Sequence, residues 1–158
     1  MITSDIHMHS SFSSDSETPM ESMIQGAAAI GLKTICFTEH LDYEYPSPDG
    51  AVLFEVDMAA YELFELKNKY KNDIEVLFGI EFGLLPHLAD RYAAVAEAHD
   101  FDFIIGSSHL IPAPWYKKDL DYIRKHGTAP KDMIHGDPYE TEFWEGRTAE
   151  DICEKYFQ

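Results

Sequence analysis

Basic residues are scarce in this 158-residue chain. It has 12 Lys and Arg against 29 Asp and Glu, a formal net charge of −17 at pH 7 with histidine neutral. No run of Lys and Arg is longer than two residues, as at Lys117-Lys118. Phosphate backbones and anionic membranes bind proteins through clustered Lys and Arg. We therefore expect neither a nucleic-acid nor a membrane partner, and the charge favours cations instead.

Cysteines and long apolar runs are also scarce. Cys36 and Cys153 are the only cysteines, so we expect no disulfide framework and a reducing compartment, the cytoplasm. No apolar stretch reaches the roughly 18 residues of a membrane span, and Asp5 and His7 interrupt the start, where a signal peptide would be apolar. A chain of this size can bury a core without disulfide or metal staples, so one domain over residues 1–158 is expected.

Hydrophobic periodicity predicts an α/β chain in which strands and helices alternate. The predicted strands cover residues 2–9, 33–40, 74–82 and 101–106, and the predicted helices cover residues 18–30, 58–70, 88–99 and 148–157. A Ser-rich loop follows the first strand, and a Pro/Gly/aromatic loop is expected over residues 111–146. Alternation of this kind implies right-handed crossovers and a parallel sheet covered by helices.

Capping signals mark two of the predicted helices. Thr18 is expected to be the N-cap of the first helix, with Pro19 at the first helical position and Gly31 as the stop. Thr148 is the expected N-cap of the last helix, with Asp151 three residues on.

Acidic and imidazole side chains follow each predicted strand. They are His7 and His9 after the first strand, Glu39 and His40 after the second, Glu81 at the third and His109 after the fourth. The carboxyl ends of parallel strands meet at one rim of a sheet or barrel, and ligands and catalytic residues gather at that rim. We therefore expect these side chains to form one site.

The chemistry of this set suits a metal ion. His7 and His9 are expected to share one face, since alternate side chains of a strand point the same way. With Asp15 in the following loop, the imidazoles and carboxylates are ligands for Zn, Mn or Fe. An ionised Glu81 among strand hydrophobics needs a compensating cation, and a metal ion would supply that charge.

Each residue taken singly has a structural alternative. His40 can cap its strand, Glu81 can pair with a lysine, and His109 can hydrogen-bond a backbone carbonyl. The four remaining histidines are weaker candidates for the site: His87 and His99 flank a predicted helix and are expected to face solvent or to cap it, while His126 and His135 lie in the long loop and could line a substrate mouth.

The order of these residues resembles the polymerase and histidinol phosphatase (PHP) superfamily. The resemblance rests on DIHMHS at 5–10 with SDS at 14–16, TEH at 38–40, GIE at 79–81, SSH at 107–109 and FWEGR at 143–147. The first motif and the last are most similar to the histidinol-phosphatase branch. The resemblance extends over essentially the whole chain.

Membership would imply a distorted PHP-type (β/α) barrel, of which this chain holds about four βα units, with a cluster of two or three divalent metals, Zn, Mn or Fe. The implied metal ligands are His7, His9, Asp15, His40, Glu81 and His109. Glu81 would bridge two ions, and His7, His9, Glu81 and His109 are the expected catalytic residues. The implied reaction is hydrolysis of a small phosphate monoester, L-histidinol phosphate, in histidine biosynthesis. Arg147 or Lys117-Lys118 could assist phosphate binding.

The end of the chain departs from the family pattern. Family members continue with a further histidine and then an aspartate and a histidine close together, a motif that does not occur before Gln158. Residues 1–158 are therefore expected to be the N-terminal portion of a PHP domain, without the C-terminal part of the barrel. Three interpretations stay open: a phosphatase completed by another chain or read from a truncated gene, a non-catalytic metal-binding fragment that covers its open sheet edge by dimerising, and nucleic-acid processing, which the charge of −17 disfavours.

Overall fold

The computed structural model describes residues 2–45, 55–57, 64–112, 125 and 135–157. The chain divides into two compact units. The first comprises Met1–Tyr43 and Val52–Ser107, and the second comprises Glu44–Ala51 and Ser108–Gln158. The expectation of one domain over residues 1–158 stays a prediction.

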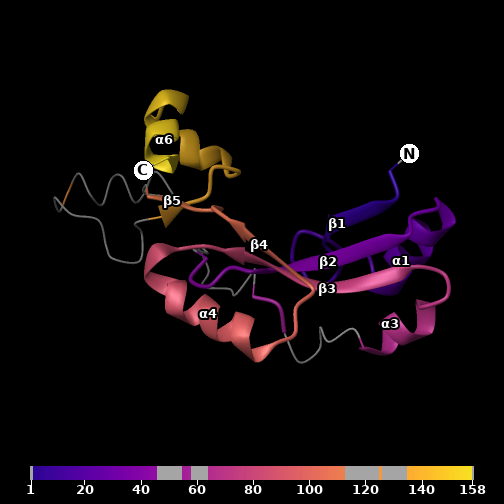
Figure 1. The fold of residues 1–158 in the computed structure, drawn as a ribbon. Helices are drawn as coiled ribbons and strands as arrows, with labels where there is room; N and C mark the ends of the chain where they lie inside the picture. The colour runs from indigo at the N-terminus through magenta and orange to yellow at the C-terminus, as the bar shows by residue number, and fades with distance from the viewer. Residues whose placement is uncertain (1, 46–54, 58–63, 113–124, 126–134, 158) are drawn as a thin grey trace. The chain divides into compact units, whose positions relative to one another are not determined.

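A four-stranded parallel sheet forms the first unit (Figure 1). Its strands are β1 (Ser4–Met8), β2 (Thr34–Leu41), β3 (Glu75–Gly83) and β4 (Phe103–Ser107). Their order in the sheet is the order in the chain, and each neighbouring pair is parallel. The predicted alternation of strands and helices around a parallel sheet is therefore confirmed.

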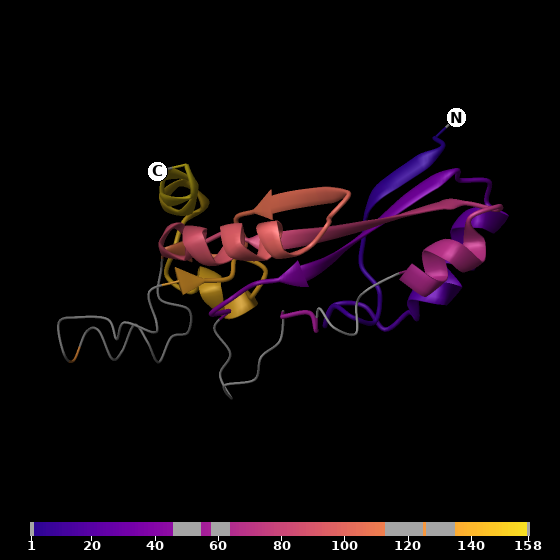
Figure 2. The same ribbon diagram turned by 60° about the horizontal axis from the view of Figure 1, so that its bottom comes forward.

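Helices connect these strands. They are α1 (Met20–Ala29), α3 (Phe64–Tyr70) and α4 (Ala89–Ala98), the last preceded by the 3-10 turn η1 (Pro86–Leu88). Figure 2 shows α1 and α3 next to one another, where Lys69 and Tyr70 both donate hydrogen bonds to Glu21. Residues 58–63 of the expected second helix lie outside the described residues. No helix in the described part of the chain is long and apolar enough to cross a membrane.

The first helix begins later than its capping signal indicates. It starts at Met20, and Pro19 takes the cap position in an extended conformation without a side-chain cap bond. The expectation of Thr18 as N-cap is therefore wrong: the Thr18 carbonyl accepts a hydrogen bond from Ser11 N (2.9 Å), so this residue belongs to the preceding loop. Gly31 ends the helix as expected, with a φ of 90° that favours glycine.

Burial is concentrated in the two central strands. Ile35 and Phe37 of β2 and Ile80 of β3 are fully buried, as expected of inner parallel strands. The outer strands β1 and β4 are largely exposed, and β4 presents Phe103 and Ile104 to solvent. The carboxyl ends of β2 and β3 are consequently held by a rigid, well-packed centre.

The second unit contains short elements that the sequence did not predict. They are β5 (Ile111–Pro112), β6 (His135–Gly136) and the 3-10 turn η3 (Thr141–Trp144). The unit also contains α6 (Ala149–Tyr156), the helix predicted over residues 148–157. The expectation of an uninterrupted loop over 111–146 is wrong where β5 and β6 pair as antiparallel strands and at η3. Ile111, Phe143 and Ile152 form a small core. Thr148 caps α6 as expected, since its hydroxyl accepts from Asp151 N.

The two thiols provide a test of the buried central sheet. Cys36 in β2 has no exposed surface, and burial, with the charge of Asp102 adding to it, raises the pKa of its thiol to about 12. Cys153 on α6 is exposed. In the native chain, we expect Cys153 to react promptly with a maleimide. Cys36 should react only in denaturant, and mass spectrometry of the labelled chain measures both reactions. Two equally reactive thiols would contradict the buried β2, and Cys153→Ser should leave the native chain unlabelled.

Candidate metal centre

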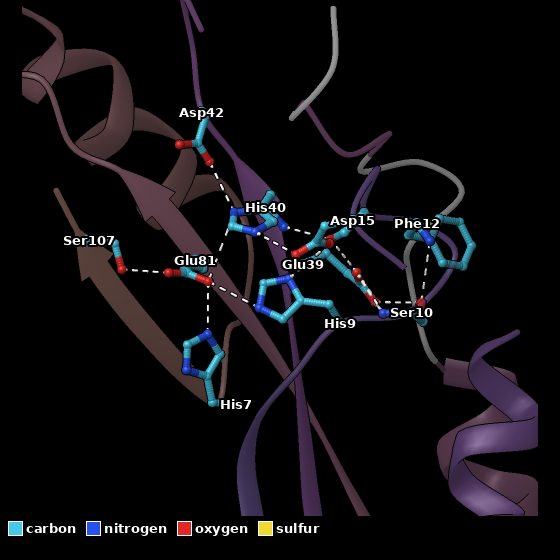
Figure 3. A network of polar contacts seen from close by, with 11 residues as sticks. His7, His9, Ser10, Phe12, Asp15, Glu39, His40, Asp42, Glu81 and Ser107 are labelled. Carbon is cyan, nitrogen blue, oxygen red and sulfur yellow. Dashed lines mark hydrogen bonds and ion pairs between the residues drawn. The ribbon is translucent and has the colours of Figure 1, made fainter. Parts of the chain in front are cut away.

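The carboxylate of Glu81 is the centre of a cluster of imidazoles (Figure 3). Glu81 lies near the end of β3 and is only 3% exposed. Its Oε2 is 2.9 Å from His7 Nε2, 3.2 Å from His9 Nε2 and 3.9 Å from His40 Nδ1. Its other oxygen, Oε1, accepts a hydrogen bond of 2.5 Å from the Ser107 hydroxyl. One carboxylate oxygen therefore faces three imidazoles from two other strands and their ends.

The register of the sheet explains this convergence. His40 in β2 pairs directly with Glu81 in β3, so the two side chains leave the sheet on the same face. β1 lies on the other side of β2 and brings His7, while His9 follows one residue after the strand ends. A register irregularity between Asp5 and Met8 accompanies the placement of both histidines beside one carboxylate.

Asp15 adds a second carboxylate from the loop after β1. Its Oδ1 lies 3.7 Å from His9 Nδ1, and its Oδ2 lies 3.4 Å from His40 Nε2. The rings of His9 and His40 are tilted against each other with centroids 4.4 Å apart. His9 thus stands between two groups of possible ligands, one with His7 and Glu81 and one with Asp15 and His40.

A buried carboxylate on β2, Glu39, anchors the loop that carries Asp15. Glu39 is fully buried and accepts hydrogen bonds from Ser10 N (3.0 and 3.1 Å), the Ser10 hydroxyl (2.5 Å) and the Ser13 hydroxyl (2.5 Å). The Ser13 hydroxyl in turn accepts from His40 N at 3.0 Å. Because β1 ends at Met8, this backbone nitrogen lies beyond the β1–β2 ladder, and the serine satisfies it.

The sequence did not predict that Glu39 anchors the loop that carries Asp15. The sequence predicts that Glu39 joins the other strand-end side chains in one site, whereas in the structure its carboxylate binds Ser10 and Ser13. Asp42 is not among the predicted site residues. The missed signal is the pair of serines in a loop facing a strand-borne glutamate. A buried acid needs several donors, and serine hydroxyls near in space supply them.

The electrostatics of His9 reflect its surroundings. Burial acts to lower the pKa of this imidazole, because it disfavours the charged form. The hydrogen bond with Glu81 and the negative charges of Asp15 and Glu81 act in the opposite direction, and Glu39 adds to them. They outweigh burial, so the pKa of His9 lies above its ordinary value of 6.5. The cluster therefore favours positive charge at its centre.

The residues present fit a divalent cation. Among the described side chains, His9 Nδ1 is a buried nitrogen without a hydrogen-bond partner, although Asp15 Oδ1 lies 3.7 Å away. Buried polar atoms are nearly always satisfied, and a bound water or ion is one explanation of an exception. In each of the two groups described above, one ligand atom per residue lies within 4.8 Å of the others. Imidazole nitrogens with carboxylate oxygens are suitable donors for zinc or manganese.

Five of the six expected ligands lie together in the first unit: His7, His9, Asp15, His40 and Glu81. The sixth, His109, belongs to the second unit, and its role as a ligand stays a prediction. Of the weaker candidates, His87 lies in η1, and His99 ends α4 with its ring against Phe101. His126 and the side chain of His135 are outside the described residues.

Parallel strands with imidazoles and carboxylates at their carboxyl ends define a class of protein: part of a (β/α) barrel with a candidate metal centre. A family model for the PHP domain matches residues 5–158, and the chain belongs to this family. The expected fold class and the expected resemblance are both confirmed.

Relatives within the family are histidinol-phosphatases. The chain is 35% identical over 109 residues to the histidinol-phosphatase of Lactococcus lactis and 33% identical over 107 residues to a probable histidinol-phosphatase of Clostridium acetobutylicum. Each match covers 68% of this chain and 39% of the relative. The crystal structure of histidinol phosphate phosphatase from Lactococcus lactis, complexed with zinc, L-histidinol and phosphate, matches with a TM-score of 0.62 and 34% identity. That match covers 68% of this chain and 40% of the other, so the chain spans well under two thirds of these relatives.

Removing the acceptor that anchors the loop should destabilise the chain. Glu39→Gln keeps the size of the side chain but places an amide NH₂ against hydroxyl and backbone donors. We expect a loss of about 1–3 kcal/mol in the free energy of unfolding, measured by urea denaturation. The matched control is Glu97→Gln on the exposed face of α4, which should change stability by less than about 0.5 kcal/mol. Equal stability of the two variants would contradict the anchoring role.

Proposed function

We propose that this chain carries the metal centre of a phosphomonoester hydrolase of the histidinol-phosphatase type, which converts L-histidinol phosphate and water to L-histidinol and phosphate in histidine biosynthesis in the cytoplasm. The observation that carries the proposal is the placement of three imidazoles around Glu81 Oε2. The likeness to the zinc, L-histidinol and phosphate complex of the Lactococcus lactis protein supports this substrate class.

The proposed ligands are the residues that the resemblance implies: His7, His9, Asp15, His40, Glu81 and His109. Two or three divalent ions, Zn, Mn or Fe, are proposed for a complete site. When bound, such ions act as Lewis acids towards phosphate oxygens and make water a stronger nucleophile. As in the expectation from sequence, His7, His9, Glu81 and His109 are the proposed catalytic residues.

The described residues prepare this site by holding its ligands in place. Ser107 donates to Glu81 Oε1, which leaves Oε2 facing His7 and His9. Glu39 fixes the loop that carries Asp15 through the hydroxyls of Ser10 and Ser13 described above. Preorganised ligands lose little conformational entropy on binding a cation, which favours metal affinity.

The extent of the chain is also part of the proposal. We infer that residues 1–158 correspond to the N-terminal portion of a PHP domain, because four parallel strands are about half of a typical eight-stranded closed barrel. A completing chain or a second copy is the proposed macromolecular partner of this chain. The small phosphate ester would be its ligand, without nucleic acid or membrane as partners.

Replacing the central carboxylate tests the metal centre and the activity together. Wild-type chain purified without chelator is expected to carry zinc, manganese or iron by elemental analysis and to release phosphate from L-histidinol phosphate. Glu81→Gln should lower metal affinity and phosphate release by more than about 100-fold. Substitution of a residue that only hydrogen-bonds to a metal ligand already costs about 10- to 100-fold, and loss of a ligand should cost more.

The control for this experiment is Glu97→Gln, which should retain both metal and turnover because Glu97 is exposed on α4. A wild-type preparation that is free of metal and inactive would contradict the proposal. So would a Glu81→Gln variant with wild-type metal content.

A non-catalytic metal-binding assembly is a second candidate, and the exposure of the outer strands favours it. Ile6 on β1 and Phe103 and Ile104 on β4 are exposed, and such edges are a liability unless they are covered. We expect light scattering to give the mass of a dimer. A metal-loaded dimer without phosphatase turnover would favour this candidate over the first, and a stable monomer would contradict pairing.

A further inference from the structure

Asp42 lies directly behind the metal-facing histidine of β2. Its side chain is 2% exposed, and its Oδ2 lies 3.2 Å from His40 Nδ1, within hydrogen-bond distance. The opposite nitrogen, His40 Nε2, faces Asp15 Oδ2 at 3.4 Å. The His40 ring is therefore held between a buried acid at one nitrogen and an exposed loop acid at the other, as Figure 3 shows.

Space for Asp42 depends on Gly83 in the neighbouring strand. A Cβ atom at Gly83 would lie 1.8 Å from Asp42 Oδ1 and 2.3 Å from Asp42 Cγ. Both distances are too short for non-bonded atoms, so the added atom would clash with the Asp42 side chain. The Gly83 backbone is fixed where it is, because its carbonyl accepts a hydrogen bond of 2.5 Å from the buried hydroxyl of Tyr92. A larger residue at this position would therefore displace the carboxylate of Asp42 rather than the strand.

We propose that Asp42 is a positioning residue that fixes the ring orientation of His40 and keeps the proton on Nδ1, so that Nε2 presents its lone pair to a cation held with Asp15 and His9. Gly83 is the residue that makes room for it. The inference deepens the function proposed above and rests on it for the identity of the cation. A histidine that binds a metal through one nitrogen commonly donates from the other to a carboxylate, which fixes tautomer and orientation.

Two other carboxylates face the same ring. Glu81 Oε2 lies 3.9 Å from His40 Nδ1, beyond hydrogen-bond distance, and Asp15 competes for the proton at Nε2. Burial decides between the two acids. The Asp15 side chain is 46% exposed and can be hydrated, whereas the Asp42 side chain is 2% exposed and depends on donors from the protein. The proton is therefore placed on the side of Asp42.

Nitrogen NMR of the metal-free chain tests this placement without any metal. With ¹⁵N-labelled histidine, at a pH where the imidazole is neutral, His40 is expected to show the Nδ1–H tautomer. Asp42→Ala and Gly83→Ala should both reduce the Nδ1–H population, the first by removing the acceptor and the second by displacing it. Asp42→Asn, which keeps an acceptor oxygen, should fall between wild type and Asp42→Ala.

Zinc affinity measured against a chromophoric chelator is the second readout. Asp42→Ala and Gly83→Ala are each expected to weaken zinc binding by about 10- to 100-fold. The matched controls are Asp73→Ala, an exposed aspartate before β3, and Gly26→Ala in α1, where an added Cβ meets no atom within 4 Å. Both controls should bind zinc as the wild type does.

The outcomes separate the two proposals. A wild-type His40 that carries its proton on Nε2, or an Nδ1–H tautomer that persists in Asp42→Ala, overturns the role of Asp42 whatever the zinc result. Unchanged zinc affinity in both variants also overturns it when the wild type binds zinc. A wild type that binds no zinc but shows the Nδ1–H tautomer, lost in Asp42→Ala, instead contradicts the proposed function and upholds the positioning role.

Discussion

The buried carboxylate of Glu81 is the constraint on which the rest of the centre depends. Placing an acid at 3% exposure near the end of a central strand is unfavourable unless positive charge or several donors surround it. The fold meets this demand with the imidazoles of His7 in β1 and His9 just after it, and with the hydroxyl of Ser107 in β4. The buried negative charge of Glu81 and the surrounding imidazoles therefore favour binding of a cation, and the proposed metal centre rests on this.

The supports of the cluster come from the same strands that carry it. In β2, Glu39 turns to the loop after β1 and holds it through Ser10 and Ser13, while the next residue, His40, enters the cluster. The carboxylate of Asp42, two residues further along the chain, contacts Nδ1 of the same histidine. One strand end thus combines a proposed ligand with the groups that hold this side chain and the neighbouring loop, so the proposed site and the local fold share hydrogen bonds.

The parts that could be predicted from the sequence are those with a local signal. The apolar runs of β2 and β3, the glycine that ends α1 and the threonine that caps α6 each depend on residues close together in the chain. The predicted start of α1 at Thr18 is wrong because the carbonyl of Thr18 accepts a hydrogen bond from Ser11 N. This contact closes the loop before the helix, and hydrophobic periodicity carries no signal for it.

Non-local contacts also explain what was missed in the site. Four proposed ligands, His7, His9, His40 and Glu81, could be predicted to meet because parallel strands end at one rim, and Asp15 lies in the loop that follows the first of these strands. The roles of Glu39 and Asp42 depend on partners in another loop or strand, and an acidic residue in sequence does not reveal whether it is solvated or buried. The short pairing of β5 with β6 was missed because two-residue strands leave no periodicity.

Diffraction at the zinc absorption edge, from crystals of the chain grown with zinc, tests the central claim most directly. The account predicts an anomalous peak about 2.0–2.2 Å from Glu81 Oε2 and from an imidazole nitrogen of His7 or His9. Zinc bound only at other places, with Glu81 still in direct hydrogen-bond contact with His7, would contradict it.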